Sequence, residues 1–339
     1  MQAAPTVAVV GATGAVGREL VRLLEARAFP LGSLRLLASA SSAGESVAFG
    51  GGTLTVEELV PGALDGVELA FFAAGGRVTR EHAPAALASG CLVIDSSSAH
   101  RLDPEVPLVV PELNGDDLAS HQGLVASPNC TTTVLLMALA PLHAAFGCTH
   151  VVGASYQAVS GAGADGMTEL RAQEADVLAG RAPTPSVFPH PIAGNLLPHV
   201  DRFDADGHTG EETKLRDESR KILHHPSLRV SMTCVRVPVL RAHSVAASAA
   251  FGRPVTVEAA REVLAAAPGL ELQDDPATQL YPTPLDRAGR DLCAVGRLRR
   301  DEVWDHGLAF WVSGDQLLKG AALNAVQIAE ALHAREATT

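Results

Sequence analysis

The chain has 339 residues and a formal net charge of −12, and 47% of its residues are hydrophobic. Such a length accommodates two domains with separate cores. The lack of a basic run excludes nucleic acid as an expected partner, and no apolar run reaches the length of a membrane span. Five cysteines are scattered without a C-x-x-C pair, so neither a disulfide framework nor a metal site is expected. With no signal-peptide pattern at its start, the chain is predicted to be a reduced, cytoplasmic protein.

The first part of the chain alternates apolar runs with helical patterns. The runs are continuously apolar and end in Gly or Ser clusters, which is typical of parallel strands covered on both faces. They lie at 6–10, 34–39, 67–76, 91–98 and 107–113. A helix is predicted after the first run, at 18–29. We therefore expect residues 1–128 to form a Rossmann-like, doubly wound α/β domain that binds a dinucleotide.

A glycine loop joins the first predicted strand to the first helix. It reads GATGAVG, with Gly11, Gly14 and Gly17 three residues apart. Glycines let a backbone approach a pyrophosphate closely, and the N-terminus of the following helix donates N–H groups to it. Because the loop has a strand before it and a helix after it, dinucleotide binding is favoured over a plain tight turn.

The segment after the second predicted strand carries serines. A ribose-binding acid is expected there in NAD-binding domains, but the sequence has Ser39, Ser41 and Ser42. Without a carboxylate to repel it, a 2′-phosphate is tolerated, which favours NADP.

The second part of the chain has a different pattern, with alternating strands and separate helices. Strands are predicted at 150–160, 228–240, 244–251 and 307–313, and helices at 131–146, 163–180 and 211–223. The proline-rich segment Arg181–Pro191 is predicted to be a long loop. Residues 129–315 are therefore expected to form an α+β domain with a mostly antiparallel sheet. A last helix at 316–335 is expected to pack back on the first domain.

Cys130 stands at the entrance of the helix predicted at 131–146. Ser-Pro-Asn precedes it, which is typical of a helix start. A thiol in a first helical turn meets unpaired N–H groups and the positive end of the helix dipole, and both favour the nucleophilic thiolate. A buried packing role is an equal alternative on this stretch alone, because free cysteines are often plain hydrophobes.

Several charged residues also invite a functional interpretation. Arg236 shares the apolar face of a predicted strand, where it needs either an anionic ligand or a structural carboxylate. His243 follows that strand and is a candidate proton shuttle, although a lone histidine is more often structural. Glu211 and Lys214 share a helix face, which an exposed ion pair would explain. Arg101 follows the fourth apolar strand, at the end of the sheet where ligands bind, or else is a surface arginine.

Taken in order, these segments resemble the bacterial aspartate-semialdehyde dehydrogenase family over nearly the whole chain. The similar blocks are VAVVGATGAVGRELVRLLE, FFAAGG, VPLVVPELN, SPNCTTT, SYQAVSGAG, TCVRVPVLRAHS, VGRLRRD and SGDQLLKGAALNAVQIAE. Each block by itself is weak evidence for the family, whereas the whole set in this order is specific to it.

The resemblance implies a reaction. The family reduces L-4-aspartyl phosphate to L-aspartate 4-semialdehyde with NADPH and releases phosphate, an early step toward lysine, methionine and threonine. Cys130 matches the nucleophile that forms a thioester, His243 the acid/base residue, and Gln157 the residue that orients the intermediate. The family also implies a homodimer or homotetramer built through the second domain.

Binding residues follow from the same resemblance. Arg236 matches the clamp on the substrate carboxylate and Glu211 the partner of its amino group. The residues that match the phosphate site are Arg101, Asn129 and Lys214. Those that match the pyrophosphate loop are Thr13, Gly14, Ala15 and Val16, and those near the nicotinamide are Ser160, Gly161 and Gln316.

The sequence departs from the family at a few positions. Ser41 stands where the family often has an arginine for the 2′-phosphate, so both NADP and NAD remain open as the nucleotide. Gln316 replaces a usual Asn. Ser96 and His100 replace a usual Asn and Phe near Arg101.

Two other functions compete with this one. N-acetyl-gamma-glutamyl-phosphate reductase shares the architecture and thioester chemistry, but its family carries G-C-Y-P-T where this chain has PNCTTT. Its substrate lacks a free amine, so Glu211 would meet no cation. A non-catalytic dinucleotide sensor of the same fold has no need of Cys130, Gln157, Arg236 and His243 together.

Overall fold

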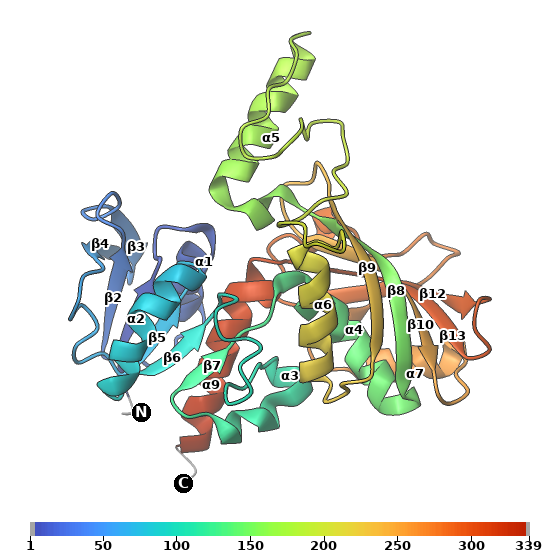
Figure 1. Ribbon diagram of the computed structural model, residues 1–339, viewed down its shortest axis with the longest axis horizontal. Helices are drawn as coiled ribbons and strands as arrows, with labels where there is room; N and C mark the ends of the chain where they lie inside the picture. The colour runs from blue at the N-terminus through green and yellow to red at the C-terminus, as the bar shows by residue number, and fades with distance from the viewer. Residues whose placement is uncertain (1–3, 337–339) are drawn as a thin grey trace. The chain divides into compact units, whose positions relative to one another are not determined.

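The structure is a computed structural model that describes residues 4–336. The chain divides into two compact units (Figure 1). Residues up to Asn129 and those from Ala321 onward form the first unit, and Cys130–Gly320 form the second. No helix among the described residues is long and apolar enough to cross a membrane.

The first unit is built on a seven-stranded sheet with the order β3-β4-β2-β1-β5-β6-β7. Its strands are β1 (Thr6–Val10), β2 (Ser33–Ala38), β3 (Ser46–Phe49), β4 (Gly52–Glu58), β5 (Leu69–Phe72), β6 (Leu92–Asp95) and β7 (Leu124–Ala126). All neighbours pair in parallel except β3 with β4. The Rossmann-like prediction is confirmed, and the antiparallel β3 extends one edge of the sheet.

Helices accompany this sheet. They are α1 (Ala15–Ala26), α2 (Gly76–Ala88), the short α3 (Pro111–Asn114) with the 3-10 helix η1 (Gly115–Ser120), and α9 (Leu323–Glu336). α1 has a clear apolar face, with Leu20, Leu23 and Leu24 buried. Arg27 after α1 pairs with Glu330 of α9 at 2.7 Å. The C-terminal helix therefore belongs to the first unit, although it follows the whole of the second in sequence.

The prediction of a strand at 107–113 is wrong. Leu108 pairs with Ala126 through an isolated bridge, and Pro111 begins α3. The Asn114 side chain explains the difference, since it accepts the N–H of Val110 at 2.9 Å and donates to the Leu108 carbonyl at 2.8 Å. These bonds satisfy backbone groups that a strand neighbour would otherwise satisfy.

The second unit contains a mixed six-stranded sheet with the order β11-β12-β13-β10-β8-β9. Its strands are β8 (Cys148–Gln157), β9 (Arg229–Arg236), β10 (His243–Phe251), β11 (Leu270–Leu272), β12 (Cys293–Asp301) and β13 (Gly307–Gly314). The three central pairings are antiparallel, whereas β11–β12 and β8–β9 are parallel. The prediction of a mostly antiparallel sheet is confirmed. The sequence did not predict β11 and β12, because neither has an alternating pattern of apolar residues.

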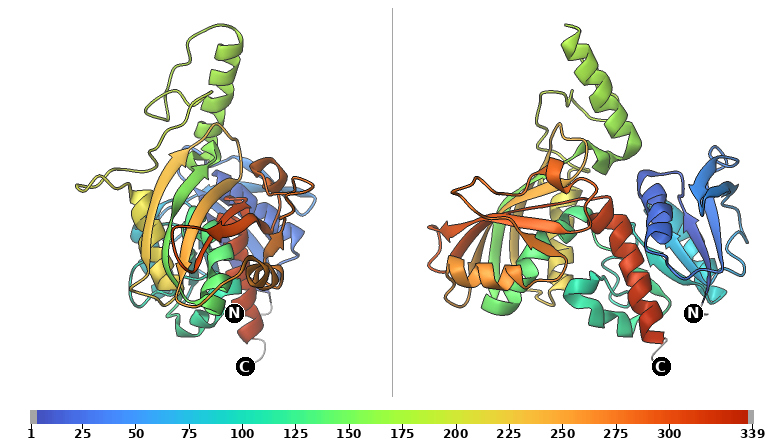
Figure 2. Two further views of the ribbon diagram at one scale, coloured as in Figure 1. Left: turned by 90° about the vertical axis from the view of Figure 1, so that its right-hand side faces the viewer. Right: turned by 180° about the vertical axis from the view of Figure 1, so that it is seen from behind.

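Three helices of the second unit pack on one face of this sheet. α4 (Cys130–Phe146) packs against β10, β8 and β13, α6 (Gly210–Ile222) against β9, and α7 (Val257–Ala265) against β11 and β12. The remaining helices are η2 (Val159–Ala162), α5 (Gly163–Leu178), α8 (Pro284–Arg287) and the π-helix η3 (Leu318–Ala322). α5 extends away from the sheet (Figure 2), and the loop after it returns to β9, where Leu197 pairs with Arg236. The helix predicted at 316–335 thus begins as a π-helix and continues as α9.

Candidate active site

The glycine loop of the first unit needs its glycines for two different reasons. Gly11 has φ +88°, and a Cβ there would lie 2.8 Å from the backbone of Ala73. A Cβ on Gly17 would lie 2.0 Å from the carbonyl oxygen of Gly11. The loop is therefore held tightly under the start of α1, and Gly14 is the N-cap residue of that helix. This is the geometry in which free N–H groups face a pyrophosphate.

Hydroxyl groups gather beside this loop. Ser39 and Ser41 lie 2.9 Å apart through their Oγ atoms, and Thr13 donates to the Ser42 hydroxyl at 3.3 Å. Arg18 lies in the first helix without any sequence signal that marks it as functional. Its Nε donates to the Thr13 carbonyl at 3.0 Å, while its Nη2 pairs with Glu45 at 3.1 Å. An exposed guanidinium thus stands next to the hydroxyl cluster.

Cys130 differs from the other four cysteines. It is the first residue of α4 and is partly exposed, whereas Cys91, Cys148, Cys234 and Cys293 are buried. Burial raises the pKa of Cys91, Cys148 and Cys234 to about 12. A Cβ on Gly320 would lie 2.8 Å from Cβ of Cys130, so this glycine makes room for the cysteine. Cys130 is therefore accessible to solvent and lies at a helix N-terminus, and both features are typical of reactive cysteines.

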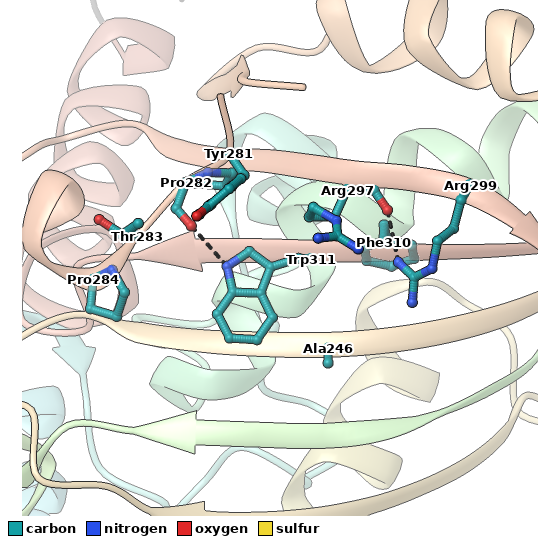
Figure 3. Close-up of a pocket in the computed structure, with 9 residues that line it drawn as sticks. All are labelled: Ala246, Tyr281, Pro282, Thr283, Pro284, Arg297, Arg299, Phe310 and Trp311. Carbon is teal, nitrogen blue, oxygen red and sulfur yellow. Dashed lines mark hydrogen bonds between the residues drawn. The ribbon is translucent and has the colours of Figure 1, made fainter. Parts of the chain in front are cut away.

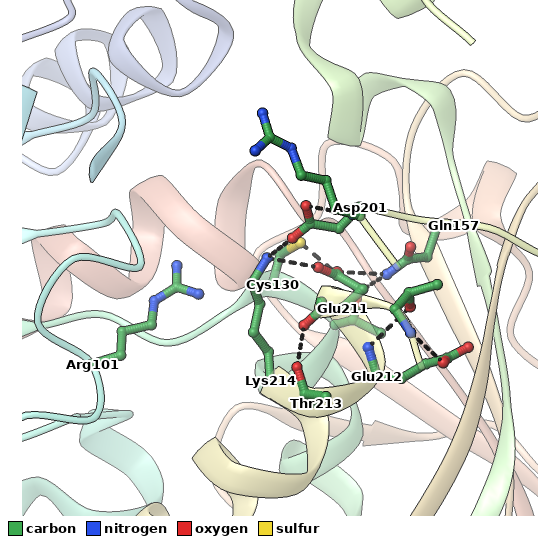
Figure 4. Close-up of polar contacts among 12 residues, drawn as sticks. Arg101, Cys130, Gln157, Asp201, Glu211, Glu212, Thr213 and Lys214 are labelled. Atoms are coloured by element: carbon green, nitrogen blue, oxygen red, sulfur yellow. Dashed lines mark hydrogen bonds and ion pairs between the residues drawn. The ribbon is translucent and has the colours of Figure 1, made fainter. Parts of the chain in front are cut away.

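A chain of polar contacts connects the region of Cys130 to Lys214 (Figure 4). The Thr131 hydroxyl is 3.9 Å from the Cys130 sulfur and 3.2 Å from Oε1 of Glu211. The Gln157 amide donates to Thr131 and, at 2.9 Å, to Glu211. Oε2 of Glu211 is 3.4 Å from Lys214 Nζ. Glu211 is only 6% exposed, so the alternative of a solvated surface ion pair is wrong.

The start of α6 holds Glu211 in place. Thr209 and Glu212 form a capping box, in which each side chain accepts the other residue's backbone N–H. The second carboxylate oxygen of Glu212 accepts the N–H of Cys234 at 3.0 Å, which ties the helix to β9. Asp201 binds Lys214 at 2.6 Å. Nothing in the sequence indicated Asp201, because it lies in an irregular loop.

Arg236 lies on the covered face of β9 with Met232 and Cys234, as its alternation predicted. It is 7% exposed, and among the described residues it forms no ion pair with a carboxylate. Its one described side-chain hydrogen bond goes from Nη1 to the Ala158 carbonyl at 2.7 Å. Burial lowers the pKa of Arg236, while Glu211 and Cys130 act against the change. A buried, largely unsatisfied fork is suited to a carboxylate ligand.

His243 is 1% exposed, and its Nδ1 accepts the backbone N–H of Ala158 at 3.1 Å. An N–H group donates to that nitrogen, so the neutral imidazole carries its proton on Nε2. Burial first, and then the charge of Arg236, lower the pKa of His243 well below its usual value. The ring is therefore neutral near pH 7 and presents a hydrogen-bond donor.

The residues matched to the nicotinamide side also lie around this histidine. A Cβ on Gly161 would lie 2.7 Å from Nη1 of Arg236 and 3.2 Å from Nε2 of His243. The Gln316 amide donates to the Ser160 hydroxyl and accepts the N–H of Ala242 at 2.8 Å. Gln316 therefore joins the Ser160 side chain to the backbone of the residue before His243.

The structure places Arg101 and Asn129 in the first unit and Lys214 in the second. Arg101 is 8% exposed and donates to the carbonyls of Ser127 at 3.0 Å and Ser96 at 2.9 Å. It is therefore not the surface arginine that the alternative interpretation required.

Comparisons with known proteins agree with this site. Residues 6–121 match the family described as semialdehyde dehydrogenase, NAD binding domain, and residues 139–319 match its dimerisation domain. Aspartate-semialdehyde dehydrogenases from Synechocystis sp. and Bacillus subtilis are each 46% identical, with 96% of both chains covered. A crystal structure of aspartate semialdehyde dehydrogenase II from Vibrio cholerae, complexed with ASA, has a TM-score of 0.94 at 39% identity and covers 97% of this chain and 98% of that one. The chain therefore belongs to the aspartate-semialdehyde dehydrogenase family, oxidoreductases of amino-acid biosynthesis with a nucleotide-binding Rossmann domain.

Proposed function

We propose that the protein reduces L-4-aspartyl phosphate to L-aspartate 4-semialdehyde with NADPH and releases phosphate. The observation that supports this most strongly is the combination of a partly exposed Cys130 with the buried Arg236 and Glu211 in one unit. These supply a nucleophile, a site for a carboxylate and a site for an ammonium group. L-4-aspartyl phosphate carries both of those groups beside its acyl phosphate.

Cys130 is the nucleophile in this proposal. Its thiolate attacks the acyl carbon, so that a C–S bond forms and the C–O bond to phosphate breaks, which leaves a thioester. A reduced nicotinamide nucleotide, when bound, would supply a hydride to that thioester. The resulting thiohemiacetal oxyanion collapses, the C–S bond breaks, and the aldehyde and the thiolate are released together.

His243 acts on the oxygen atom of these tetrahedral species. Because Ala158 occupies Nδ1, the neutral ring offers Nε2–H, and this donor stabilises the oxyanion. The collapse returns a thiolate, so the reduction step itself needs no proton from the ring, and the one proton that the overall reaction takes up ends on the departing phosphate. Gln157 contributes by holding Thr131 and Glu211 next to the nucleophile.

Substrate recognition uses the buried charges. Arg236 binds the α-carboxylate through its fork, and Glu211 binds the α-ammonium group. Lys214 binds the phosphate group, a role to which the family resemblance also matches Arg101 and Asn129. Asp201 holds the Lys214 ammonium group through an ion pair of 2.6 Å.

The nucleotide is proposed to be NADP. Gly11, Gly14 and the start of α1 fit a pyrophosphate, and the hydroxyls of Ser39, Ser41 and Ser42 fit a ribose phosphate. Arg18 supplies a cation beside these hydroxyls, in the absence of the family's arginine at position 41. Ser160, Gly161 and Gln316 are assigned to the nicotinamide side.

The family's dimerisation domain supports assembly, and we propose a homodimer through the sheet face that α4, α6 and α7 leave uncovered. Tyr156 and Trp311 meet on that face with ring centroids 5.2 Å apart, and Val152, which precedes Tyr156 on the same face of β8, is 38% exposed. A hollow lined by Tyr281, Arg297, Arg299 and Trp311 adjoins it (Figure 3).

All five cysteines are free thiols, which is consistent with a reducing, cytoplasmic location.

The test is phosphate-dependent nucleotide reduction with L-aspartate semialdehyde, run in parallel with NADP and NAD and with N-acetyl-glutamate semialdehyde as the competing substrate. Turnover with aspartate semialdehyde that requires phosphate supports the proposal. Turnover with the acetylated substrate alone would assign the protein to the alternative reductase, which the relatives do not favour.

A further inference from the structure

The proline-rich loop after α5 has no helix or strand, yet it brings one aromatic side chain to Arg236. Every residue from Thr184 to His190 is exposed except Phe188. The Phe188 ring lies under the guanidinium of Arg236, with Cζ 5.8 Å from the ring centroid. A cation this close to an aromatic face is attracted to it, and more strongly where water is excluded.

Two buried side chains of α5 hold the loop on both sides of Phe188. Oε2 of Glu169 accepts the Ser186 N–H at 3.1 Å, the Ser186 hydroxyl at 2.9 Å and the Val187 N–H. One turn along the helix, Oε1 of Gln173 accepts the N–H groups of Ile192 at 2.8 Å and Ala193 at 3.1 Å. Glu169 and Gln173 are 5% and 1% exposed.

The helix also leaves space for the ring. A Cβ on Gly166 would lie 3.2 Å from Cζ of Phe188 and 2.6 Å from the Val159 carbonyl oxygen. Phe188 packs against the buried cluster of Val159, Leu170, Ile192 and Leu197. Leu197 in turn pairs with the backbone of Arg236, with its N–H 3.0 Å from the Arg236 carbonyl oxygen. The loop therefore contacts Arg236 twice, through its backbone and through its guanidinium.

We propose that Phe188 is a positioning residue for substrate binding, held by Glu169 and Gln173, which fixes the plane of the Arg236 guanidinium for the substrate α-carboxylate. This proposal rests on the function proposed above. Each contact fixes a different part of the Arg236 guanidinium. Nη1 is fixed by the Ala158 carbonyl, one face is fixed by Phe188, and the rest of the fork is left for the ligand. A loop that only connected α5 to α6 would not need the buried hydrogen bonds of Glu169 and Gln173. These bonds therefore favour a positioning role for the loop.

Glu169 is suited to this task at neutral pH. Burial alone would raise the pKa of Glu169, but the N–H of Val187 and the hydroxyl and N–H of Ser186 lower it overall. The anchor is therefore a carboxylate, which accepts several donors at once.

The first test compares Phe188→Leu with Phe188→Tyr in steady-state kinetics. Phe188→Leu removes the aromatic face and is expected to raise the KM for L-aspartate semialdehyde about five- to tenfold, with the KM values for phosphate and nucleotide unchanged. Phe188→Tyr keeps the face and is expected to restore the wild-type KM. Phe203→Leu makes the same change at an exposed ring and serves as the control. An unchanged KM in Phe188→Leu would overturn the proposal.

A double-mutant cycle shows whether Phe188 acts through Arg236. If it does, Phe188→Leu has little further effect on the KM in an Arg236→Lys background, because the fork it positions is gone. Equal fold-changes in the two backgrounds would assign Phe188 a separate role and contradict the proposal. Glu169→Gln removes the anchoring charge and is expected to reproduce the KM increase of Phe188→Leu.

A spectroscopic measurement separates failure of this inference from failure of the proposed function. In protein labelled at arginine side chains, the Arg236 resonance is assigned by its loss in Arg236→Lys. A ring-current shift that disappears in Phe188→Leu but persists in Phe203→Leu supports the contact even if the enzyme turns over another substrate. An Arg236 resonance that is identical in wild type and Phe188→Leu would contradict it.

Discussion

The backbone N–H of Ala158 lies 3.1 Å from Nδ1 of His243. The carbonyl oxygen of the same residue accepts Nη1 of Arg236 at 2.7 Å. One backbone unit at the end of β8 therefore selects the tautomer of the histidine and fixes the arginine. Because both bonds go to the backbone of one residue, the two functional groups keep a constant relation to each other.

Arg236→Lys is expected to raise the KM for L-aspartate semialdehyde roughly ten- to a hundredfold, because an ammonium group replaces a bidentate fork in a buried site. The kcat is expected to change less. Steady-state kinetics at saturating phosphate and nucleotide measures both values. Arg229→Lys, at the exposed start of the same strand, is the control. A wild-type KM in Arg236→Lys would remove this residue from the carboxylate site.

Gly161→Ala is expected to lower kcat/KM by at least about tenfold, because a Cβ there would lie 2.7 Å from Arg236 and 3.2 Å from His243. The added methyl group has to displace one of the two side chains. Gly115→Ala is a matched control, since nothing lies within 4 Å of its Cβ position. Normal kcat/KM in a folded Gly161→Ala protein would show that the site tolerates the displacement.

Asp201 provides a prediction on acid stability. Burial alone would raise the pKa of Asp201, but its hydrogen bond from Lys214 and the charges of Lys214 and Arg202 lower it overall. A carboxyl with a lowered pKa in the folded state stabilises the protein above its unfolded-state pKa, and this contribution is lost as the pH falls through the lowered value. We expect denaturant midpoints to fall more steeply for wild type than for Asp201→Asn between about pH 5 and pH 2. The difference should be small, since the Asp201 side chain is 39% exposed. Parallel pH profiles for the two proteins would show that the pair with Lys214 contributes nothing.

Ser41→Arg is expected to increase the preference for NADP over NAD about tenfold, because a guanidinium makes charge-assisted hydrogen bonds to a 2′-phosphate. The ratio of kcat/KM for the two nucleotides measures this preference. Arg18→Gln is expected to shift the ratio in the opposite direction. If neither variant changes the ratio, the 2′-phosphate does not bind beside the serine cluster.

The sequence predicted the strands and helices that have strong periodicity, such as β1, α4 and the β9 face that carries Arg236. It did not predict β12, where Arg297, Arg299 and Arg300 give no apolar alternation, nor the edge strands β3 and β11. These elements exist because neighbouring strands supply their hydrogen bonds, which is information that no local pattern contains.

The candidate site shows the same limit. Cys130 was indicated by its position at a helix start, and the resemblance supplied the roles of Gln157 and His243. The tautomer of His243, the buried state of Glu211 and the contact of Phe188 with Arg236 depend on segments far apart in the chain. They could be found only from the folded structure.

The central claim is that Cys130 carries the acyl group. The most direct test mixes the enzyme with L-aspartate semialdehyde and NADP without phosphate. A single-turnover burst of NADPH is expected, followed by slow turnover, and mass spectrometry should find the aspartyl group on Cys130. Cys130→Ala should bind nucleotide normally and give no burst, while Cys148→Ala, which alters a buried thiol, should give the wild-type burst. A burst in Cys130→Ala, or an acyl group on another residue, would contradict the account.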